Sequence, residues 1–106
     1  MGVTFKENCP DMRNTKVIDV ISELSQFGCT IDCYDPWVNE ENVKQELKIN
    51  QVKYPAQNTY DAIILAVSHD EFIKLGSKKI RDFGKENHIL YDLKYLFPKN
   101  QSDLRL

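Results

Sequence analysis

Lys6 and Arg13 are the side chains near the start of the 106-residue sequence that could bind an anion. They lie in a polar loop, which follows a short apolar run over residues 3–5 that we interpret as the end of a strand. An amphipathic helix is predicted to begin at Asn14 or Thr15. In open α/β sheets, ligands bind where such loops meet helix N-termini, and the backbone N–H groups there favour anions. A lysine point charge beside an arginine fork therefore indicates a phosphate or pyrophosphate ligand.

A simpler interpretation of the same charges stays open. Single charged residues are common on protein surfaces, so both cations could be solvated and paired with Glu7 and Asp11. Asp11 itself is expected to orient Arg13 or to cap the helix rather than to do chemistry. Spacing alone does not decide between an anion site and a charged surface loop.

Residues 2–14, Gly-Val-Thr-Phe-Lys-Glu-Asn-Cys-Pro-Asp-Met-Arg-Asn, resemble the opening of the UDP-binding, C-terminal domain of the UDP-glucose/GDP-mannose dehydrogenase family. These NAD-dependent enzymes oxidise a nucleotide sugar to the uronic acid. The variant Phe-Lys-Glu-Asn-Cys-Pro-Asp is most similar to the bacterial branch that oxidises UDP-N-acetylhexosamines for surface polysaccharides such as capsules. The likeness continues in order through residues 34–38, 61–67, 69–72, 91–94 and 102–106, so it covers nearly the whole chain.

This resemblance implies roles for four residues. Phe5 and Lys6 match the family's contacts to the UDP-sugar, and Arg13 matches an arginine on the NAD side. Phe5 is equally well explained as a core residue at a strand end. Lys94 stands where many members carry the arginine of an Asp-x-Arg motif; a lysine keeps the charge there but loses the fork.

The resemblance also implies that residues 1–106 are a single substrate-binding domain, inactive alone. The NAD-binding and central domains of the enzyme, with its catalytic residues, would lie elsewhere, and the full-length enzyme would be a homo-oligomer. Cys9 does not match the motif of the family's nucleophilic cysteine, so it is not expected to be catalytic. A different class stays open: a stand-alone doubly wound binding or regulatory module, such as a phosphoacceptor receiver. A receiver needs an acidic cluster at its strand ends, whereas the first strand here ends in Phe5-Lys6.

Composition excludes several partners. The formal net charge is -2, without a basic block for nucleic acid or a membrane surface. The sequence has no apolar run of the roughly 20 residues that cross a bilayer, and no signal-peptide pattern, so a cytoplasmic location is expected. Cys9, Cys29 and Cys33 include no Cys-x-x-Cys pair, and we expect three reduced thiols and no metal site.

Hydrophobic periodicity predicts alternating strands and helices, and hence a three-layer, Rossmann-like open parallel sheet with helices on both faces. Asn14 is a predicted N-cap and Gly28 a predicted stop for the first helix. The expected helices cover residues 15–27, 39–47, 70–75 and 77–83, with a helical turn at 94–97. The expected strands cover residues 30–34, 49–54, 61–67 and 88–92, and residues 99–106 are expected to be loose.

Two further segments follow strands and therefore lie at the carboxyl edge of the sheet. Asp35 stands where dinucleotide folds place an acid for a ribose, but the chain has no Gly-x-Gly-x-x-Gly before it, so we interpret Asp-Pro as a turn. Ser68 with Glu71 has capping-box spacing. His69 could serve in catalysis, but solvated helix-capping residues are the preferred interpretation of this segment.

Overall fold

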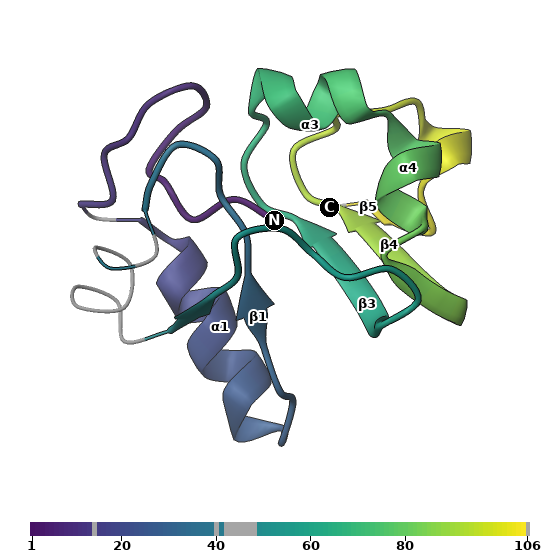
Figure 1. The fold of residues 1–106 in the computed structure, drawn as a ribbon, viewed down its shortest axis with the longest axis horizontal. Coiled ribbons are helices and arrows are strands. Elements are labelled where there is room, and N and C mark those ends of the chain that lie inside the picture. Colours follow the sequence, from purple (N-terminus) through teal and green to yellow (C-terminus); the bar gives the residue numbers. More distant parts are fainter. Residues whose placement is uncertain (14, 40, 42–48, 106) are drawn as a thin grey trace.

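The computed structural model describes residues 1–13, 15–39, 41 and 49–105 (Figure 1). Its elements are α1 Val17–Gln26, β1 Asp32–Cys33, β2 Asn50–Gln51, β3 Tyr60–Leu65, α3 Asp70–Leu75, α4 Ser77–Arg81, β4 Gly84–Asp92, the 3₁₀ helix η1 Lys99–Gln101 and β5 Leu104–Arg105. The helix over residues 70–75 is confirmed with its predicted bounds, whereas β1 and β2 are shorter than predicted. The helix predicted over residues 39–47 falls largely outside the described residues.

The strands within the described residues pair in parallel. β1 pairs with β2, and β3, β4 and β5 form a second sheet in that order. The first residues of the chain lie between the two sheets. Met1 donates through its amino group to Ile64 O at 2.6 Å and accepts from Ala66 N at 2.9 Å, while Gly2 N donates to Tyr34 O at 2.8 Å. The N-terminal segment therefore occupies a central strand position (Figure 1).

The strand end predicted at residues 3–5 is nevertheless wrong. Val3 N and Thr4 N donate to the carboxylate of Asp35 at 2.7 and 3.3 Å instead of to a neighbouring strand. The parallel ladder therefore stops after Gly2, and the chain bends into the loop that carries Lys6.

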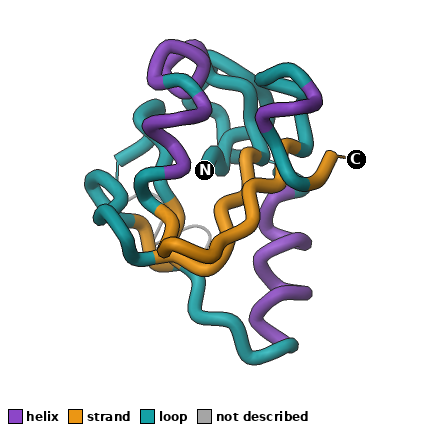
Figure 2. Tube along the Cα trace, turned by 90° about the vertical axis from the view of Figure 1, so that its right-hand side faces the viewer, coloured by secondary structure: helices purple, strands orange, loops and turns teal. Residues whose placement is uncertain are grey.

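Helices cover both faces of the sheets. Figure 2 shows α1 on one side of the strands and the helices α3 and α4 on the other. Two apolar cores reflect these layers. The core on the α3–α4 side consists of Ile63, Leu65, Phe72, Ile80, Phe83, Leu90 and Phe97. The core on the α1 side consists of Val3, Met12 and Cys33, with Val17 and Ile21 of α1 packed against it. The predicted Rossmann-like α/β class is confirmed.

The ends of α1 follow only part of the prediction. Its N-cap is Lys16 without a side-chain cap, and Thr15 Oγ1 accepts from Val17 N at 3.3 Å. The predicted N-cap, Asn14, lies outside the described residues. The predicted stop at Gly28 is confirmed, because this glycine has φ +85° and donates to Ser25 O at 3.0 Å.

The C-terminal part of the chain corrects two expectations. The helical turn predicted over residues 94–97 does not form, because Tyr95 has a positive φ and the Asp92 carboxylate accepts from Leu96 N at 2.9 Å and Phe97 N at 3.0 Å. Residues 99–105 are not loose: they form η1 and β5, and β5 pairs with β4. Residue 106 lies outside the described residues. The short β5 has too few residues to show an alternating pattern in the sequence.

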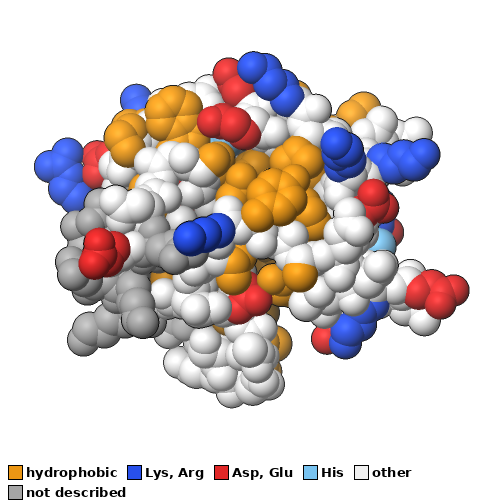
Figure 3. Space-filling model, viewed as in Figure 1, with side chains coloured by type: hydrophobic (Ala, Val, Ile, Leu, Met, Phe, Trp, Pro, Cys, Tyr) orange, Lys and Arg blue, Asp and Glu red, His pale blue; other side chains and the backbone are white. Residues whose placement is uncertain are grey.

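The three cysteines are free, as predicted: Cys29 is exposed, Cys9 half-buried and Cys33 buried. Among the described residues, the search for a helix of the length and hydropathy needed to span a bilayer found none. Figure 3 shows lysine and arginine side chains scattered over one face of the molecule rather than gathered in a patch.

Candidate functional site

The Lys6 loop, residues 5–11, is closed by a hydrogen bond from Phe5 N to Asp11 O at 2.7 Å. Inside this closure, Thr4 Oγ1 donates to Lys6 O at 2.9 Å. The Lys6 side chain is exposed and forms no ion pair with any described residue. Phe5 is 56% exposed, so its interpretation as a core residue is wrong. The loop thus presents an aromatic ring and an ammonium group to solvent, side by side in the sequence.

Arg13 is held by Asp11. Its Nε donates to Asp11 Oδ1 at 3.0 Å and its Nη2 donates to Asp11 Oδ2 at 3.1 Å, while the Arg13 backbone N–H also donates to Oδ1. The hydrogen bonds from Arg13 hold the pKa of Asp11 below its usual value, and the charge of Lys6 contributes in the same direction. Asp11 in turn raises the pKa of Arg13. The predicted orienting role of Asp11 is confirmed, and the carboxylate lies in the field of both cations.

Beneath this loop lies a buried pair that the sequence interpretation missed, Asp35 and His69. Asp35 is 1% exposed and His69 is 0% exposed. Asp35 Oδ2 accepts a hydrogen bond from His69 Nε2 at 2.9 Å. Asp35 Oδ1 accepts from Trp37 N at 2.8 Å, and this hydrogen bond closes the predicted Asp-Pro turn. Burial alone would raise the pKa of Asp35, but hydrogen bonds from His69 and from the N–H groups of Val3 and Trp37 hold it below its usual value.

His69 connects this pair to the loop. Its Nδ1 accepts from Asn8 N at 2.9 Å, and Asn8 Oδ1 in turn accepts from Asp70 N at 2.9 Å. The expectation of a solvated His69 is therefore wrong: His69 occupies the N-cap position of α3, but its side chain is buried and makes no capping hydrogen bond. The Ser68 capping box is also wrong, because the N-cap residue of α3 is His69 and the side chain of Asn8 satisfies the first helical N–H. The long-range partner could not be read from local spacing.

An indole ring lies over the buried pair. The rings of Trp37 and His69 are stacked with centroids 6.0 Å apart and an interplanar angle of 30°. Trp37 Nε1 donates to Glu71 Oε1 at 3.1 Å, which fixes the indole against α3. The His69 ring also packs against Phe72 in a T-shaped arrangement, with ring centroids 5.3 Å apart. His69 is thus enclosed between aromatic rings and the Lys6 loop.

Lys94 follows β4 in a turn and is exposed. Because the carboxyl ends of parallel strands meet at one edge, Lys94 and the Lys6 loop belong to the same edge of the sheet. No hydrogen bond or ion pair within the described part of the chain joins Lys94 to Lys6 or Arg13. Arg13 is bound to Asp11, Lys6 contributes to the field at this carboxylate without pairing with it, and Lys94 is exposed in a separate turn.

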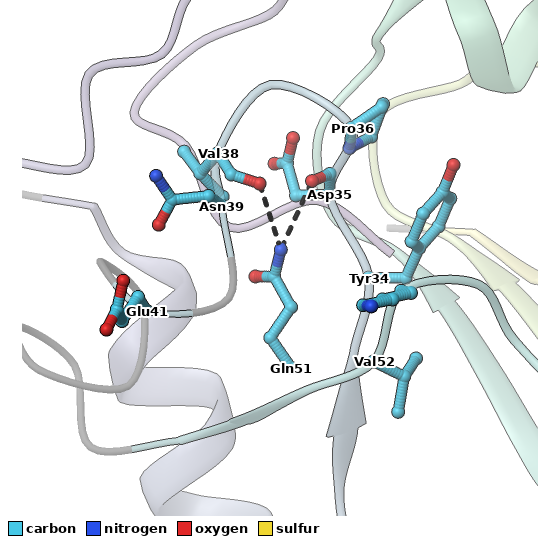
Figure 4. Close-up of a pocket in the computed structure, with 9 residues that line it drawn as sticks. Tyr34, Asp35, Pro36, Val38, Asn39, Glu41, Gln51 and Val52 are labelled. Carbon is cyan, nitrogen blue, oxygen red and sulfur yellow. Dashed lines mark hydrogen bonds between the residues drawn. The ribbon is translucent and has the colours of Figure 1, made fainter.

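An open cavity of about 770 Å³ lies beside the end of β1 (Figure 4). Gln51 spans its wall, since its Nε2 donates to Asp35 O at 3.3 Å and to Val38 O at 3.1 Å. The described lining residues are Tyr34, Asp35, Pro36, Val38, Asn39, Glu41, Gln51, Val52 and Lys53. None of the four predicted site residues lines it, so the cavity and the Lys6 loop are different features of this edge.

An open parallel sheet with helices on both faces, and with a cation-bearing loop at its carboxyl edge, defines a Rossmann-like α/β domain. The chain belongs to the UDP-glucose/GDP-mannose dehydrogenase family, whose UDP-binding domain matches residues 1–99. This match confirms the family that residues 2–14 indicated, and it extends over almost the whole chain.

Curated relatives extend this result. The UDP-N-acetyl-D-glucosamine 6-dehydrogenase of Salmonella typhi is 54% identical over all 106 residues, and that of Pseudomonas aeruginosa is 53% identical over the same length. Protein CapL of Staphylococcus aureus is 32% identical over 89% of the chain and 22% of its own length. The chain spans about a quarter of the length of the first two relatives, 25% in each case.

Proposed function

We propose that this chain is the nucleotide-sugar-binding domain of an NAD-dependent UDP-sugar 6-dehydrogenase. The full-length enzyme oxidises a UDP-N-acetylhexosamine or a UDP-hexose to the uronic acid for polysaccharide biosynthesis. Family membership and the names of the two relatives at 54% and 53% identity support this substrate class. Residues 1–106 form the C-terminal domain, and the NAD-binding and central domains lie in other parts of a longer protein.

The observation that carries the proposal is the state of Lys6. Its ammonium group is exposed and makes no ion pair with a described residue, yet its backbone is fixed, since Lys6 O accepts from the buried Thr4. A cation on a positioned backbone can bind a diphosphate with little loss of conformational freedom. Phe5, exposed beside it, is suited to contact the rest of the substrate, and Lys94 supplies a second charge at the same edge.

Arg13 fits a role on the cofactor side. Two of its N–H groups donate to Asp11, which leaves the opposite edge of the planar guanidinium for an external phosphate. NAD accepts hydride when bound. The four glycines of the chain form no Gly-x-Gly-x-x-Gly fingerprint, so NAD is held mainly by the other domains. The isolated domain is therefore inactive, and the full-length enzyme is a cytoplasmic homo-oligomer in this proposal.

Calorimetric titration of the chain with UDP tests the assignment. We expect weak binding that falls as NaCl is raised from about 50 to 500 mM, because exposed charges are screened by salt. Lys6→Ala should abolish the heat of binding. The matched control is Lys79→Ala, which removes an equally exposed lysine from α4 and should leave binding unchanged. Identical titrations for the wild type and Lys6→Ala would contradict the proposal.

The alternative, a stand-alone binding or regulatory module, makes a different prediction. A receiver-type domain would be labelled stably by acetyl phosphate on a strand-end aspartate. Here Asp35 is buried and already accepts hydrogen bonds from Val3 and His69, which leaves it no access to a phosphodonor. Stable labelling together with no UDP binding would favour the regulatory module.

A further inference from the structure

His69 does not reach the solvent face on which a substrate would lie, yet its contacts converge on the loop that carries Lys6. We propose that His69 is a positioning residue: it fixes the Asn8 backbone and so sets the direction in which Lys6 meets the substrate diphosphate. This inference rests on the proposed function, because its target is the Lys6 ammonium group.

The hydrogen bonds of His69 define its tautomer. Nδ1 lies 2.9 Å from Asn8 N, which is a backbone donor, so Nδ1 must be the unprotonated acceptor. The ring proton is therefore on Nε2, which lies 2.9 Å from Asp35 Oδ2 and 3.2 Å from Thr4 Oγ1. The acceptor Nδ1 thus faces a donor and the donor Nε2 faces acceptors. Both ring nitrogens of His69 therefore have hydrogen-bond partners in the protein, although the side chain is buried.

The contacts of the Asp35–His69 pair lead to the backbone of the Lys6 loop. Asn8 is the middle of the Lys6 loop and adopts a positive φ of 55°, which places it at the bend of the loop. Asp35 holds the entrance of the loop by accepting from Val3 N and Thr4 N. The Asp35–His69 pair thus binds the backbone on both sides of Lys6.

The Asn8 N–H requires a hydrogen-bond acceptor at the position of His69. An apolar side chain of similar size would fill the space between Trp37 and Phe72, but it would leave the Asn8 N–H without its acceptor. A partly buried donor without a partner favours loop conformations that reach water. We therefore expect substitution of His69 to act on the loop more than on the sheet.

The test compares three variants of the chain. His69→Phe keeps an aromatic ring and removes both ring nitrogens; His69→Asn keeps an acceptor close to the place of Nδ1; His69→Gln keeps a donor close to the place of Nε2. Amide hydrogen exchange by NMR is read at Asn8, with Leu90 in β4 as the internal control. UDP affinity is measured by calorimetry on the same samples, beside wild type and Lys6→Ala.

We expect exchange at Asn8 to rise at least tenfold in His69→Phe and His69→Gln, and UDP affinity to fall at least tenfold, while Leu90 stays protected. His69→Asn should restore most of both properties. If His69→Phe does not fold, the contrast between His69→Asn and His69→Gln carries the same information.

Two results overturn the inference in distinguishable ways. If wild type binds UDP, Lys6→Ala does not, and all His69 variants bind like wild type with unchanged Asn8 exchange, the positioning role is wrong while the proposed function stands. If wild type does not bind UDP, the proposed function fails, and the positioning of Lys6 for a diphosphate fails with it.

Discussion

Asp103 Oδ2 accepts hydrogen bonds from Arg81 Nη1 at 3.0 Å and from Leu90 N at 2.8 Å. One carboxylate thereby connects the end of α4 with the middle of β4 just before β5 begins. Arg81 Nη2 adds a bond to Gln101 O at 3.1 Å. The order of the last residues of the chain depends on this contact, because β5 has only two residues.

Asp103→Ala should lower the free energy of unfolding by about 1–2 kcal/mol, since Leu90 N–H loses its acceptor and Arg81 its partner. Urea unfolding at neutral pH measures this change. The hydrogen bonds from Arg81 and Leu90 N–H hold the pKa of Asp103 below its usual value. Its stabilisation is therefore present above the ordinary carboxyl pKa and is lost as the pH falls through the lowered value, so wild type and variant should converge in acid.

The control for this prediction is Asp61→Ala. Asp61 pairs with Lys85 at 3.1 Å, but both side chains are more than half exposed. Breaking such a pair should change the free energy of unfolding by less than about 0.5 kcal/mol. Equal losses in the two variants would show that Asp103 acts as an ordinary surface charge.

Substitution of Asp35 tests the buried pair by its effect on stability. Asp35→Asn places an amide NH₂ where a carboxylate now accepts from His69, Val3 N and Trp37 N, and we expect a loss of about 3 kcal/mol. Because the folded-state pKa of Asp35 is lowered, its contribution exists above the usual carboxyl pKa and disappears as the pH falls through the lowered one.

Urea unfolding at several pH values between about 7 and 3 would measure this loss, since that range spans the titration of an ordinary carboxyl group. Asp82→Asn, at an exposed position after α4, is the matched control and should be within about 0.5 kcal/mol of wild type. A loss that is independent of pH would argue against an ionised Asp35 in the folded protein.

Gly2 and Gly28 both have a positive φ, but only Gly2 is closely packed. Comparing alanine substitutions at the two positions therefore separates the cost of the backbone conformation from the cost of a steric clash. Gly2 has φ +93° and Gly28 has φ +85°, so an alanine at either position costs about 1 kcal/mol in backbone energy. A Cβ at Gly2 would also lie 2.6 Å from Val67 Cβ, whereas a Cβ at Gly28 meets nothing within 4 Å. In thermal or urea unfolding, the free energy of unfolding of Gly2→Ala should therefore be ~1–3 kcal/mol lower than that of Gly28→Ala. The same loss in both variants would mean that the N-terminal segment does not pack against Val67 as described.

Tyr60 should be recognisable in an alkaline titration. Burial, and the hydrogen bond from its hydroxyl to Asp32 Oδ2 at 2.8 Å, raise the pKa of Tyr60 to about 12. Its stabilisation is complete below the ordinary tyrosine pKa near ~10 and is lost as the pH rises towards the raised value. Ultraviolet titration should show a late tyrosinate step that Tyr60→Phe removes.

The same variant should also lower the free energy of unfolding by about 1 kcal/mol through loss of one hydrogen bond. Tyr54→Phe provides the comparison for stability, because the Tyr54 side chain is largely exposed. A titration of Tyr60→Phe that keeps the late step would assign it to another residue and refute the prediction.

The pattern of apolar residues in the sequence was sufficient to predict the helices and strands that have a long apolar segment. The continuous apolar run of β3 and the turn at Gly28 were both predictable, since each is decided by residues close in the chain. The Lys6 loop and the pairing of Asp11 with Arg13 were predictable for the same reason: the two residues are neighbours.

The buried pair was not predictable in this way. His69 and Asp35 are separated by 34 residues, and only the parallel packing of the segments after β1 and β3 brings them together. His69 precedes two acidic residues at the start of a helix, a pattern typical of a solvated capping segment. The sequence does not show that the distant Asp35 accepts a hydrogen bond from it. The order of residues 99–105 was missed for a similar reason, since Arg81 and Leu90 bind Asp103 before β5, and β5 pairs with the distant β4.

Trp37 is the sole tryptophan of the chain, and it is stacked on His69, the residue that contacts the loop carrying Lys6. With excitation that avoids the five tyrosines, the emission therefore comes from one indole, stacked on the residue that binds the Asn8 backbone. Its emission should respond to UDP binding and to any movement of the Lys6 loop that accompanies binding. No dye has to be attached and no background indole has to be subtracted. Stopped-flow mixing could follow both events in real time on the unmodified protein.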